Sequence, residues 1–380
     1  MTKKSITDLP DDRYAGTPVF VRVDFNVSIQ NGKIREDYRL RRTIPTIEYL
    51  SRQGAKVIVA SHLGKPKGKP VPDLSLKPVA DRLSSMLMVP AVKFVGDVVS
   101  ASVTKTVEAM NPGEVFLLEN LRFHPGEEAN DPAFCQQLAT LAEIYVNEAF
   151  GTMHRAHAST YGAAQLFQER LTGYLVEKEM DVLTQGRDHA TRPLVVVGGI
   201  KIKDKLSALK ALIPKADRIL LGGGIAFTFL VAQGKVTGDS PVEHDYVPWV
   251  QEMLTHYGDK LLLPKDHVIA RALDDRTGVQ VVQGPIPKGA RGFDIGPEAT
   301  LAYTHELMRG GGTIFWNGPL GAFEEDEFAE GTVSIARAMA LAHWRGAMTV
   351  IGGGDTVATL RKADVFETEV SHVSTGGGPP

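Results

Sequence analysis

The sequence has few features of a secreted, disulfide-bonded or membrane-inserted protein. Cys135 is the single cysteine among 380 residues, so no disulfide can form within the chain. No stretch approaches the ~20 consecutive apolar residues that a membrane-spanning helix needs. The opening stretch, MTKKSITDLP, has no apolar segment of a secretory signal. We therefore expect a cytoplasmic protein that has no membrane partner.

A strong excess of one charge is also missing. The chain has 42 Lys and Arg against 45 Asp and Glu, a net charge of −3, which gives no electrostatic basis for binding nucleic acid. Two standard nucleotide fingerprints are absent as well: there is no GxxxxGK[ST] and no GxGxxG followed by an acidic residue. The second absence disfavours a nucleotide-dependent dehydrogenase. Small-molecule ligands remain the expectation.

The sequence does contain a repeated unit, in which a short apolar run is followed by a loop and a helix-like stretch. Continuous apolar runs are typical of parallel strands that are buried on both faces. Helix-like stretches such as DPAFCQQLATLAEIY and EGTVSIARAMALAHW lie between them, and in the first of these Asp131 is the expected N-cap and Pro132 the first helical residue. The pattern predicts an α/β protein with mostly parallel sheets. The runs are PVFVRVDFN, AKVIVASHLG, VFLLENLRFH, IYVNEAFG, PLVVVGGIK, RILLGGGI, TIFWNGPLG and MTVIGGGD.

Length and loop chemistry together indicate two lobes. A chain of 380 residues exceeds what one hydrophobic core comfortably organises. The loops after the runs are rich in charged side chains in the first half and in glycine in the second half. Because ligands in open α/β sheets bind beyond the carboxyl ends of the strands, we expect a small anionic ligand in one lobe and phosphates or a flat base in the other. The join is expected near residues 172–190.

The charged loops of the first half contain candidate anion ligands. Arg39, Arg122 and Arg155 are favoured because the guanidinium fork matches the oxygens of carboxylates and phosphates. Any single lysine of SHLGKPKGKP is more typical of a solvated basic face. Asp24 and Asn26 have two readings that the sequence leaves open: ligands of substrate hydroxyls, or turn residues that end a strand.

The glycine-rich loops of the second half are individually weak indicators. One GGG is typical of a tight turn from strand to helix, but four such loops in one half favour a phosphate or base held close to the backbone. Lys201, Lys203 and Lys205 share a face if the preceding strand continues, whereas a helix beginning at Asp204 points Lys205 into the ligand site. Asp355 is either a Mg²⁺ ligand beside phosphates or an N-cap.

Nine ordered stretches together resemble the phosphoglycerate kinase family: VRVDFNV, SHLGKPKG, LLENLRFHPGEE, VNEAFGTMHRAHAST, LGGGIAFTFL, FDIGP, WNGPLGAFE, GGGDT and HVSTGGG. The resemblance covers essentially the whole chain. It implies a monomer of two doubly wound, Rossmann-like parallel-sheet lobes joined by a hinge helix. The implied divisions are a 3-phosphoglycerate lobe (1–172), a helix and hinge (173–190), a nucleotide lobe (191–365) and a C-terminal segment shorter than the family's (366–380).

The resemblance also implies the reaction and its residues. The reaction is glycolytic phosphoryl transfer between 1,3-bisphosphoglycerate and ADP, giving 3-phosphoglycerate and ATP, with Mg²⁺ accompanying the nucleotide. Implied glycerate ligands are Asp24, Asn26, Arg39, His62, Lys65, Arg122 and Arg155. Implied nucleotide ligands are Gly199, Lys205, Gly223, Gly224, Gly292, Asn317, Pro319, Glu324, Gly353, Gly354, Asp355 and Thr356, with Asp355 holding the metal. Implied catalytic residues are Arg39, Lys201, Lys205, Gly354 and Gly377.

Some positions depart from the family pattern. Lys65 stands where arginine is usual, Ile200 where alanine is usual, and Lys203 where a small polar residue is usual. The terminal glycines are followed only by Pro379 and Pro380, where the family continues into a helix, so we expect a mobile terminus and reduced activity. Lys65 and the short end keep open an alternative, a related binding protein with weak or no turnover. Arg39, Lys205 and Asp355 count against that alternative.

Overall fold

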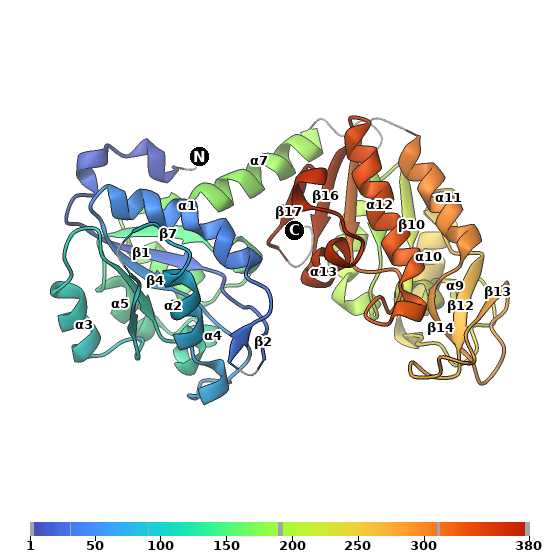
Figure 1. Cartoon of the computed structure of the whole chain (residues 1–380), viewed down its shortest axis with the longest axis horizontal. Helices are drawn as coiled ribbons and strands as arrows, with labels where there is room; N and C mark the ends of the chain where they lie inside the picture. The colour runs from blue at the N-terminus through green and yellow to red at the C-terminus, as the bar shows by residue number, and fades with distance from the viewer. Residues whose placement is uncertain (1–3, 31, 90, 189–192, 310–311, 377–380) are drawn as a thin grey trace. The chain divides into compact units, whose positions relative to one another are not determined.

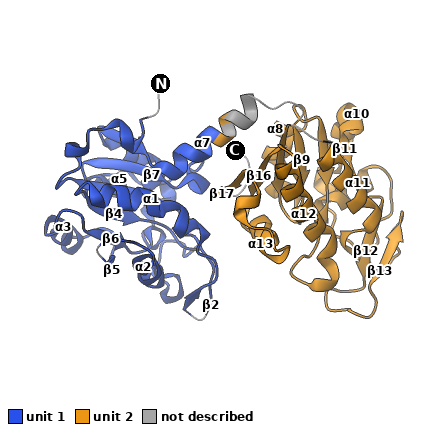
Figure 2. Ribbon diagram, turned by 45° about the horizontal axis from the view of Figure 1, so that its top comes forward, with its two compact units in different colours: residues 1–181 blue, residues 182–380 orange. Residues whose placement is uncertain are grey.

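The computed structural model describes residues 4–30, 32–89, 91–188, 193–309 and 312–376. The chain divides into two compact units, residues 1–181 and 182–380 (Figures 1 and 2). Each unit is built around one six-stranded sheet. Helix α7 (Tyr174–Asp188) begins in the first unit and crosses the division.

The sheet of the first unit is parallel throughout. Its strand order is β5-β6-β4-β1-β7-β8. The strands are β1 (Pro18–Val23), β4 (Lys56–Ala60), β5 (Lys93–Val95), β6 (Val115–Leu118), β7 (Ile144–Glu148) and β8 (Glu169–Thr172). A small hairpin of β2 (Ile29–Gln30) and β3 (Lys33–Ile34) lies outside this sheet. The order places four strands that carry charged loops side by side.

Helices cover both faces of this sheet, because successive strand residues point to opposite sides. Val21 packs with α1 (Tyr38–Arg52) and α2 (Lys77–Ser84). Phe20 packs on the other face with α3 (Ala101–Glu108), α5 (Pro132–Ala139) and α6 (Ala163–Leu166). Burial on both faces explains why the strands are continuously apolar.

The second unit repeats this plan with the order β11-β10-β9-β15-β16-β17, again parallel. Its strands are β9 (Leu194–Val197), β10 (Arg218–Leu221), β11 (Leu261–Leu262), β15 (Thr313–Asn317), β16 (Met348–Gly352) and β17 (His372–Ser374). Its helices are α8 (Leu206–Leu212), α9 (Gly223–Ala232), α10 (Val247–Tyr257), α11 (Pro297–Met308), α12 (Glu330–Trp344) and α13 (Gly354–Lys362). Helices α8, α9 and α10 contribute to the core on one face.

The second unit also contains an antiparallel sheet that the sequence did not predict. Its order is β13 (Gln280–Gln283), β12 (Asp266–Ala270) and β14 (Arg291–Ile295). A separate small core, which includes Phe227 of α9 and Ile269 of β12, lies beside it. Each of these strands includes polar or charged residues, such as Asp266, Gln280 and Arg291, so they lack the continuous apolar runs by which the parallel strands were found.

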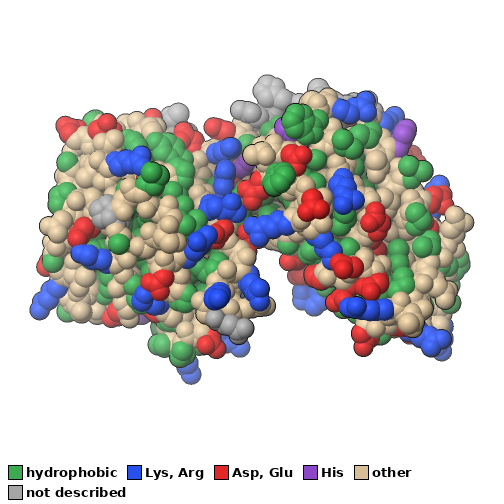
Figure 3. All heavy atoms as spheres, viewed as in Figure 1, with side chains coloured by type: hydrophobic (Ala, Val, Ile, Leu, Met, Phe, Trp, Pro, Cys, Tyr) green, Lys and Arg blue, Asp and Glu red, His purple; other side chains and the backbone are tan. Residues whose placement is uncertain are grey.

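All eight predicted apolar runs form strands, and the two sheets are parallel as expected. Asp131 is the N-cap of α5 and accepts a hydrogen bond from the Phe134 N–H at 2.9 Å. That helix is shorter than predicted and ends at Ala139, because β7 begins at Ile144. Among the described residues, no helix combines the length and apolar character needed to cross a membrane. Lys and Arg side chains are interspersed with Asp and Glu on the surface seen in Figure 3, in keeping with the small net charge.

Candidate functional site

Charged side chains of the first unit gather at one edge of its sheet. Asp24 follows β1, His62 follows β4, Arg122 follows β6 and Arg155 follows β7. These four strands are parallel neighbours, so their carboxyl ends lie along one edge. The sequence placed each residue after a strand, and the strand order brings them together.

Asp24 and Asn26 organise the first part of this edge. Asp24 Oδ2 lies 3.0 Å from Nη1 of Arg39, whose Nη1 also donates to the Asn26 carbonyl at 3.3 Å. Asn26 Oδ1 accepts the Gly64 N–H at 2.9 Å, and Asp24 Oδ1 accepts the Asn26 N–H at 3.2 Å. The two residues therefore make the turn that the sequence offered as one alternative, and they also hold the Arg39 guanidinium in place.

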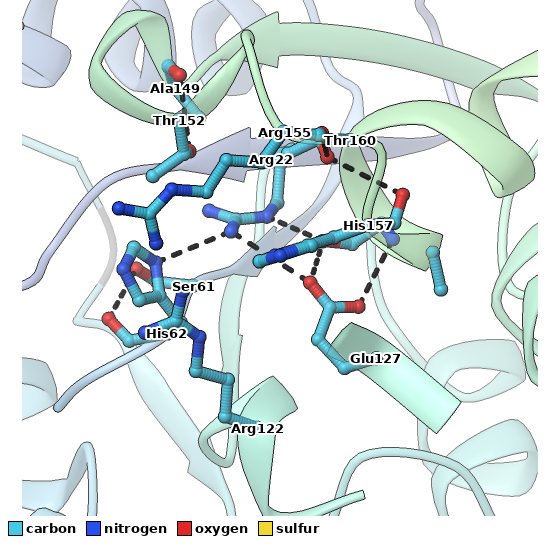
Figure 4. Close-up of polar contacts among 12 residues, drawn as sticks. Arg22, Ser61, His62, Arg122, Glu127, Ala149, Thr152, Arg155, His157 and Thr160 are labelled. Carbon is cyan, nitrogen blue, oxygen red and sulfur yellow. Dashed lines mark hydrogen bonds and ion pairs between the residues drawn. The ribbon is translucent and has the colours of Figure 1, made fainter. Parts of the chain in front are cut away.

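Arg22 is a member of this cluster that sequence reasoning missed. It lies within the apolar run of β1 and is 1% exposed. Its Nε donates to Ser159 Oγ at 2.6 Å, and its Nη2 lies 3.9 Å from Glu127 Oε1 (Figure 4). Glu127 in turn accepts from the Ser159 hydroxyl at 2.5 Å. Arg22 could have been recognised in the sequence as a single cation within an apolar run, because a buried charge needs a partner elsewhere in the chain.

Arg122 is buried but incompletely paired. It is 2% exposed, and its Nη1 donates to the Gly64 carbonyl at 2.7 Å. Its Nε lies 3.2 Å from Glu128 Oε1 without the alignment of a hydrogen bond, and its buried Nη2 has no partner among the described residues. Burial lowers the pKa of this guanidinium from its usual value. Unused donors on a buried cation favour an anionic ligand, since such groups are costly to leave unsatisfied.

His62 is surrounded by these cations. It is 1% exposed, and its Nδ1 lies 3.3 Å from Arg22 Nη2 (Figure 4). Burial, followed by the charges of Arg22, Arg122, Arg39 and Arg155, holds the pKa of His62 well below its usual range. The ring is therefore neutral near pH 7. Acceptance by Nδ1 leaves the proton on Nε2, where it can be donated to a ligand.

The remaining predicted residues of the first unit are more open. Lys65 and Arg155 are both exposed. The Arg155 backbone is held within its loop, because its N–H donates to the Thr152 carbonyl at 3.0 Å and its carbonyl accepts from Thr160 Oγ1 at 2.8 Å. Its side chain extends toward His62 in Figure 4. Lys65 directly follows Gly64, whose carbonyl accepts from Arg122, so its exposed side chain lies next to the buried cluster.

The second unit contains a cavity of about 890 Å³. It is bounded by the loops that follow β9, β10, β15 and β16, which are adjacent strands of the sheet. Nine of the residues predicted from the sequence line it: Gly199, Lys201, Lys205, Gly223, Gly224, Gly292, Pro319, Glu324 and Asp355. Ile200, a departure from the family pattern, lines it too and is 71% exposed. Asn317, Gly353, Gly354 and Thr356 are not part of its wall.

Glycine is needed in these loops partly because the loops pack on one another. Gly223 has φ +63°, and a Cβ there would lie 2.8 Å from the Gly199 carbonyl oxygen. The Gly223 N–H donates to the Leu320 carbonyl at 2.8 Å, and the Gly199 N–H donates to the Pro319 carbonyl at 2.9 Å. The glycines thus allow the backbones of neighbouring loops to pack closely, and they would also allow a ligand to approach the backbone.

Lys205 is placed between a strand end and a helix. Its Nζ donates to Asn317 Oδ1, while the buried Asn317 Nδ2 has no partner in the part of the chain that the structure describes. Burial is the main cause that lowers the pKa of Lys205, opposed by the charge of Asp355. Both sequence alternatives for this segment were wrong in detail: β9 ends at Val197, and α8 begins at Leu206 with Lys205 as its N-cap. Lys203 is exposed and lies outside the cavity wall.

Asp355 belongs to the first turn of α13, whose N-cap is Gly353. It is therefore not the N-cap that the sequence left as its alternative. Thr356 is buried and its hydroxyl accepts the Gly318 N–H at 2.7 Å, which fixes the loop after β15. Among the described residues, no hydrogen bond or ion pair engages the Asp355 carboxylate. An exposed, free carboxylate on a cavity wall fits a Mg²⁺ ion that takes its other ligands from phosphates and water.

The C-terminal strand brings the last described glycine to this region. The Gly353 N–H donates to the Gly376 carbonyl at 3.2 Å, and the Gly376 N–H donates to Ser374 Oγ at 3.1 Å. Gly376 thus lies directly beside the N-terminus of α13. Gly377, predicted to be catalytic, lies outside the described residues, as does the terminus predicted to be mobile.

Comparisons with known proteins agree with this architecture. The family model described as phosphoglycerate kinase matches residues 7–379. Phosphoglycerate kinase of Synechococcus elongatus is 47% identical over 100% of this chain and 95% of its own length. The solved structure of phosphoglycerate kinase from Coxiella burnetii is 35% identical and superposes with a TM-score of 0.82, covering 99% of this chain and 94% of its own. The structure from Pyrococcus horikoshii is 30% identical with a TM-score of 0.86, covering 98% and 94%. The chain belongs to the phosphoglycerate kinase family.

Proposed function

We propose that this chain catalyses reversible phosphoryl transfer between 1,3-bisphosphoglycerate and ADP, giving 3-phosphoglycerate and ATP in glycolysis. The observation that carries the proposal is the buried, incompletely paired guanidinium of Arg122 beside neutral His62. Four arginines surround that histidine, which is a site for a small and highly charged anion. Membership of the family supports the same reaction.

The first unit binds the glycerate in this proposal. Arg122, Arg155 and Lys65 contact its phosphate, with His62 donating from Nε2. Asp24 and Asn26 meet the hydroxyl and carboxylate region, and Arg39 lies against the group that is transferred. The proposed lobe runs from residue 1 to 172, with a connecting helix and hinge over 173–190. Residues 191–365 form the nucleotide lobe, and residues 366–380 complete the chain.

The second unit binds ADP or ATP in its cavity. Lys201 and Lys205 contact the phosphates, with Lys201 near the transferred group. The adenosine site is formed by Gly223, Gly224, Asn317, Pro319 and Glu324, and Gly199 and Gly292 are further nucleotide ligands. Gly353, Gly354 and Thr356 form the phosphate loop, and Gly377 completes the catalytic set. Asp355 holds Mg²⁺, which neutralises charge on phosphate oxygens when it is bound.

No general base is required for this reaction. The acceptor, a carboxylate or an ADP phosphate, is already ionised at neutral pH. Phosphoryl transfer has a loose transition state, so catalysis consists mainly of positioning and of stabilising charge on the transferred oxygens. Arg39, Lys201 and Lys205 supply that charge, and the turn at Asp24 orients Arg39. Transfer also requires the two units to bring their ligands into contact and to exclude water from the acyl phosphate.

A coupled assay of ATP-dependent phosphorylation of 3-phosphoglycerate tests the proposal. We expect turnover that requires Mg²⁺ and both substrates. Intact binding of Mg-ADP without turnover would instead support the alternative, a related binding protein.

We also propose that the protein is a cytoplasmic monomer. Gel filtration of the full chain, 41.2 kDa in mass, tests the monomer.

A further inference from the structure

The nucleotide cavity of the second unit contains a buried histidine that the implied site does not use. His267 lies on β12 of the antiparallel sheet and is 2% exposed. It belongs to the cavity wall together with Phe227 and Gly292. No hydrogen bond engages its imidazole within the described part of the chain. It is thus a polar ring on the wall of a ligand cavity with its donor and acceptor unused.

The strand period fixes the side to which this ring points. Asp266 and His267 are successive residues of β12, so their side chains point to opposite faces of the sheet. Asp266 accepts the backbone N–H groups of Glu298 and Ala299, at 2.9 Å and 2.8 Å, and so caps α11. The His267 ring lies on the other side, with its centroid 5.5 Å from that of Phe227 at an interplanar angle of 44°.

Phe227 supplies an aromatic surface to the cavity wall beside His267. It lies one turn along α9 from Gly223, and both residues line the cavity. A Cβ on Gly292 would lie 2.4 Å from the Phe227 ring, so the glycine makes room for that ring. The lining thus combines charged side chains, which suit phosphates, with the aromatic ring of Phe227, which suits a flat base.

The protonation of His267 suits recognition of a base. Burial is the main cause that lowers its pKa to about 4, with Asp266 acting in the opposite direction and Lys235 in the same direction. A neutral imidazole offers one N–H donor and one nitrogen acceptor. The edges of adenine and guanine present donors and acceptors in different patterns. A buried ring that can make one directed hydrogen bond will therefore favour one pattern over another.

We propose that His267 is a specificity-determining residue for the nucleobase, and that its imidazole makes a hydrogen bond to the edge of a bound purine. This proposal rests on the proposed function, since it assumes that the cavity takes a purine nucleotide. It assigns the residue to base selection rather than to chemistry, because a neutral ring packed beside Phe227 offers a directed hydrogen bond but no charge to a phosphate.

The test compares the affinities of the full chain for ADP and GDP by calorimetry. His267→Phe removes both ring nitrogens but keeps a flat ring. His267→Leu removes the nitrogens and the ring. Loss of one hydrogen bond should change the ratio of the two dissociation constants by about two- to tenfold in either variant. His267→Gln retains a donor and an acceptor and should keep the ratio closer to that of the unmodified protein. His256→Phe, an exposed position on α10, is the matched control and should leave the ratio unchanged.

Two results would overturn the proposal. One is an unchanged ratio in a folded His267→Phe or His267→Leu protein. The other is an equal shift in the Gln and Phe variants, which would assign the effect to shape rather than to a hydrogen bond.

The binding measurement does not require turnover, so the proposed role of His267 and the proposed function can fail separately. A chain that binds both nucleotides but does not phosphorylate 3-phosphoglycerate contradicts the proposed function alone. An active chain with an unchanged ratio contradicts the role of His267 alone.

Discussion

The carboxylate of Glu148, the last residue of β7, accepts a hydrogen bond from the Val176 N–H at 3.0 Å. It also accepts from the Leu175 N–H at 3.1 Å and from the Thr46 hydroxyl. These two amides belong to the first turn of α7, whose N–H groups have no partner within the helix. The start of α7 is thus capped by a residue of the strand that leads into the Arg155 loop, rather than by the sequence before the helix.

Replacing Glu148 with Gln should destabilise the protein. The amide keeps one acceptor oxygen but presents an NH₂ group to one of the two N–H donors. We expect a loss of about 1–3 kcal/mol in the free energy of unfolding, the usual cost of an unsatisfied buried polar group. Urea denaturation followed by far-UV circular dichroism measures it. Glu108→Gln, at an exposed position of α3, is the control and should be neutral.

The stabilities of the unmodified protein and of Glu148→Gln should also depend differently on pH. Burial raises the pKa of Glu148 to about 7, against which the Thr46 hydrogen bond acts. Because the folded-state pKa is raised, its contribution to stability is fully present below about pH 4.5 and is lost as the pH rises through about 7. The stability advantage of the unmodified protein over Glu148→Gln should therefore be larger at pH 5 than at pH 8. An advantage that grows with pH would show that the carboxylate is stabilised in its charged form.

Arg122→Gln should weaken binding of 3-phosphoglycerate. The substitution removes a buried cation whose Nη2 has no partner in the described structure, and a hydrogen bond to a charged group is worth about 1.5–3 kcal/mol. We expect the dissociation constant to rise roughly 10- to 100-fold, measured by calorimetry. Arg52→Gln, which breaks an exposed pair with Glu48 on α1, should leave binding unchanged. Equal affinities of the Arg122 variant and the unmodified chain would remove this residue from the site.

Lys65→Arg should improve use of 3-phosphoglycerate. A lysine keeps the charge that the family's usual arginine supplies but lacks the bidentate fork. We expect a severalfold lower KM for 3-phosphoglycerate with the KM for ATP unaffected. Lys69→Arg, another exposed lysine of the same loop, is the control. If the KM for 3-phosphoglycerate does not move, Lys65 is not a phosphate ligand.

Asp355→Asn should raise the Mg²⁺ requirement. The amide keeps the size of the side chain but loses the charge with which a carboxylate holds this ion. The Mg²⁺ concentration that gives half-maximal rate should rise at least about tenfold, as expected for loss of one charged ligand interaction of ~1.4 kcal/mol or more. Asp364→Asn, beyond the end of α13, should leave it unchanged. An unaltered Mg²⁺ dependence would place the metal on other groups.

Several parts of the molecule could be predicted because they depend on neighbours in the chain. A strand buried on both faces must be continuously apolar, so the eight strands could be located from their runs. The N-cap at Asp131 depends on the Phe134 amide only three residues away. Asp24, His62, Arg122 and Arg155 could be selected because each directly follows such a run.

Other parts depend on contacts between distant segments, which no local pattern encodes. Arg22 is a charged residue within an apolar strand, and its hydrogen-bond partner Ser159 lies 137 residues away in the sequence. The strands of the antiparallel sheet that carries His267 mix polar and apolar residues and contain no continuous apolar run. The cap of α7 comes from Glu148, 27 and 28 residues before the amides that it binds.

The sequence by itself therefore determined the class of fold, the family and the residues at the strand ends, because each follows from short-range periodicity or from ordered motifs. Tertiary structure alone decided which strands are neighbours, and so which of those residues share a site. It also decided that Arg122 is buried with unused donors and that His62 is neutral. Burial and the sum of nearby charges set both properties, and they exist only once distant segments have packed together.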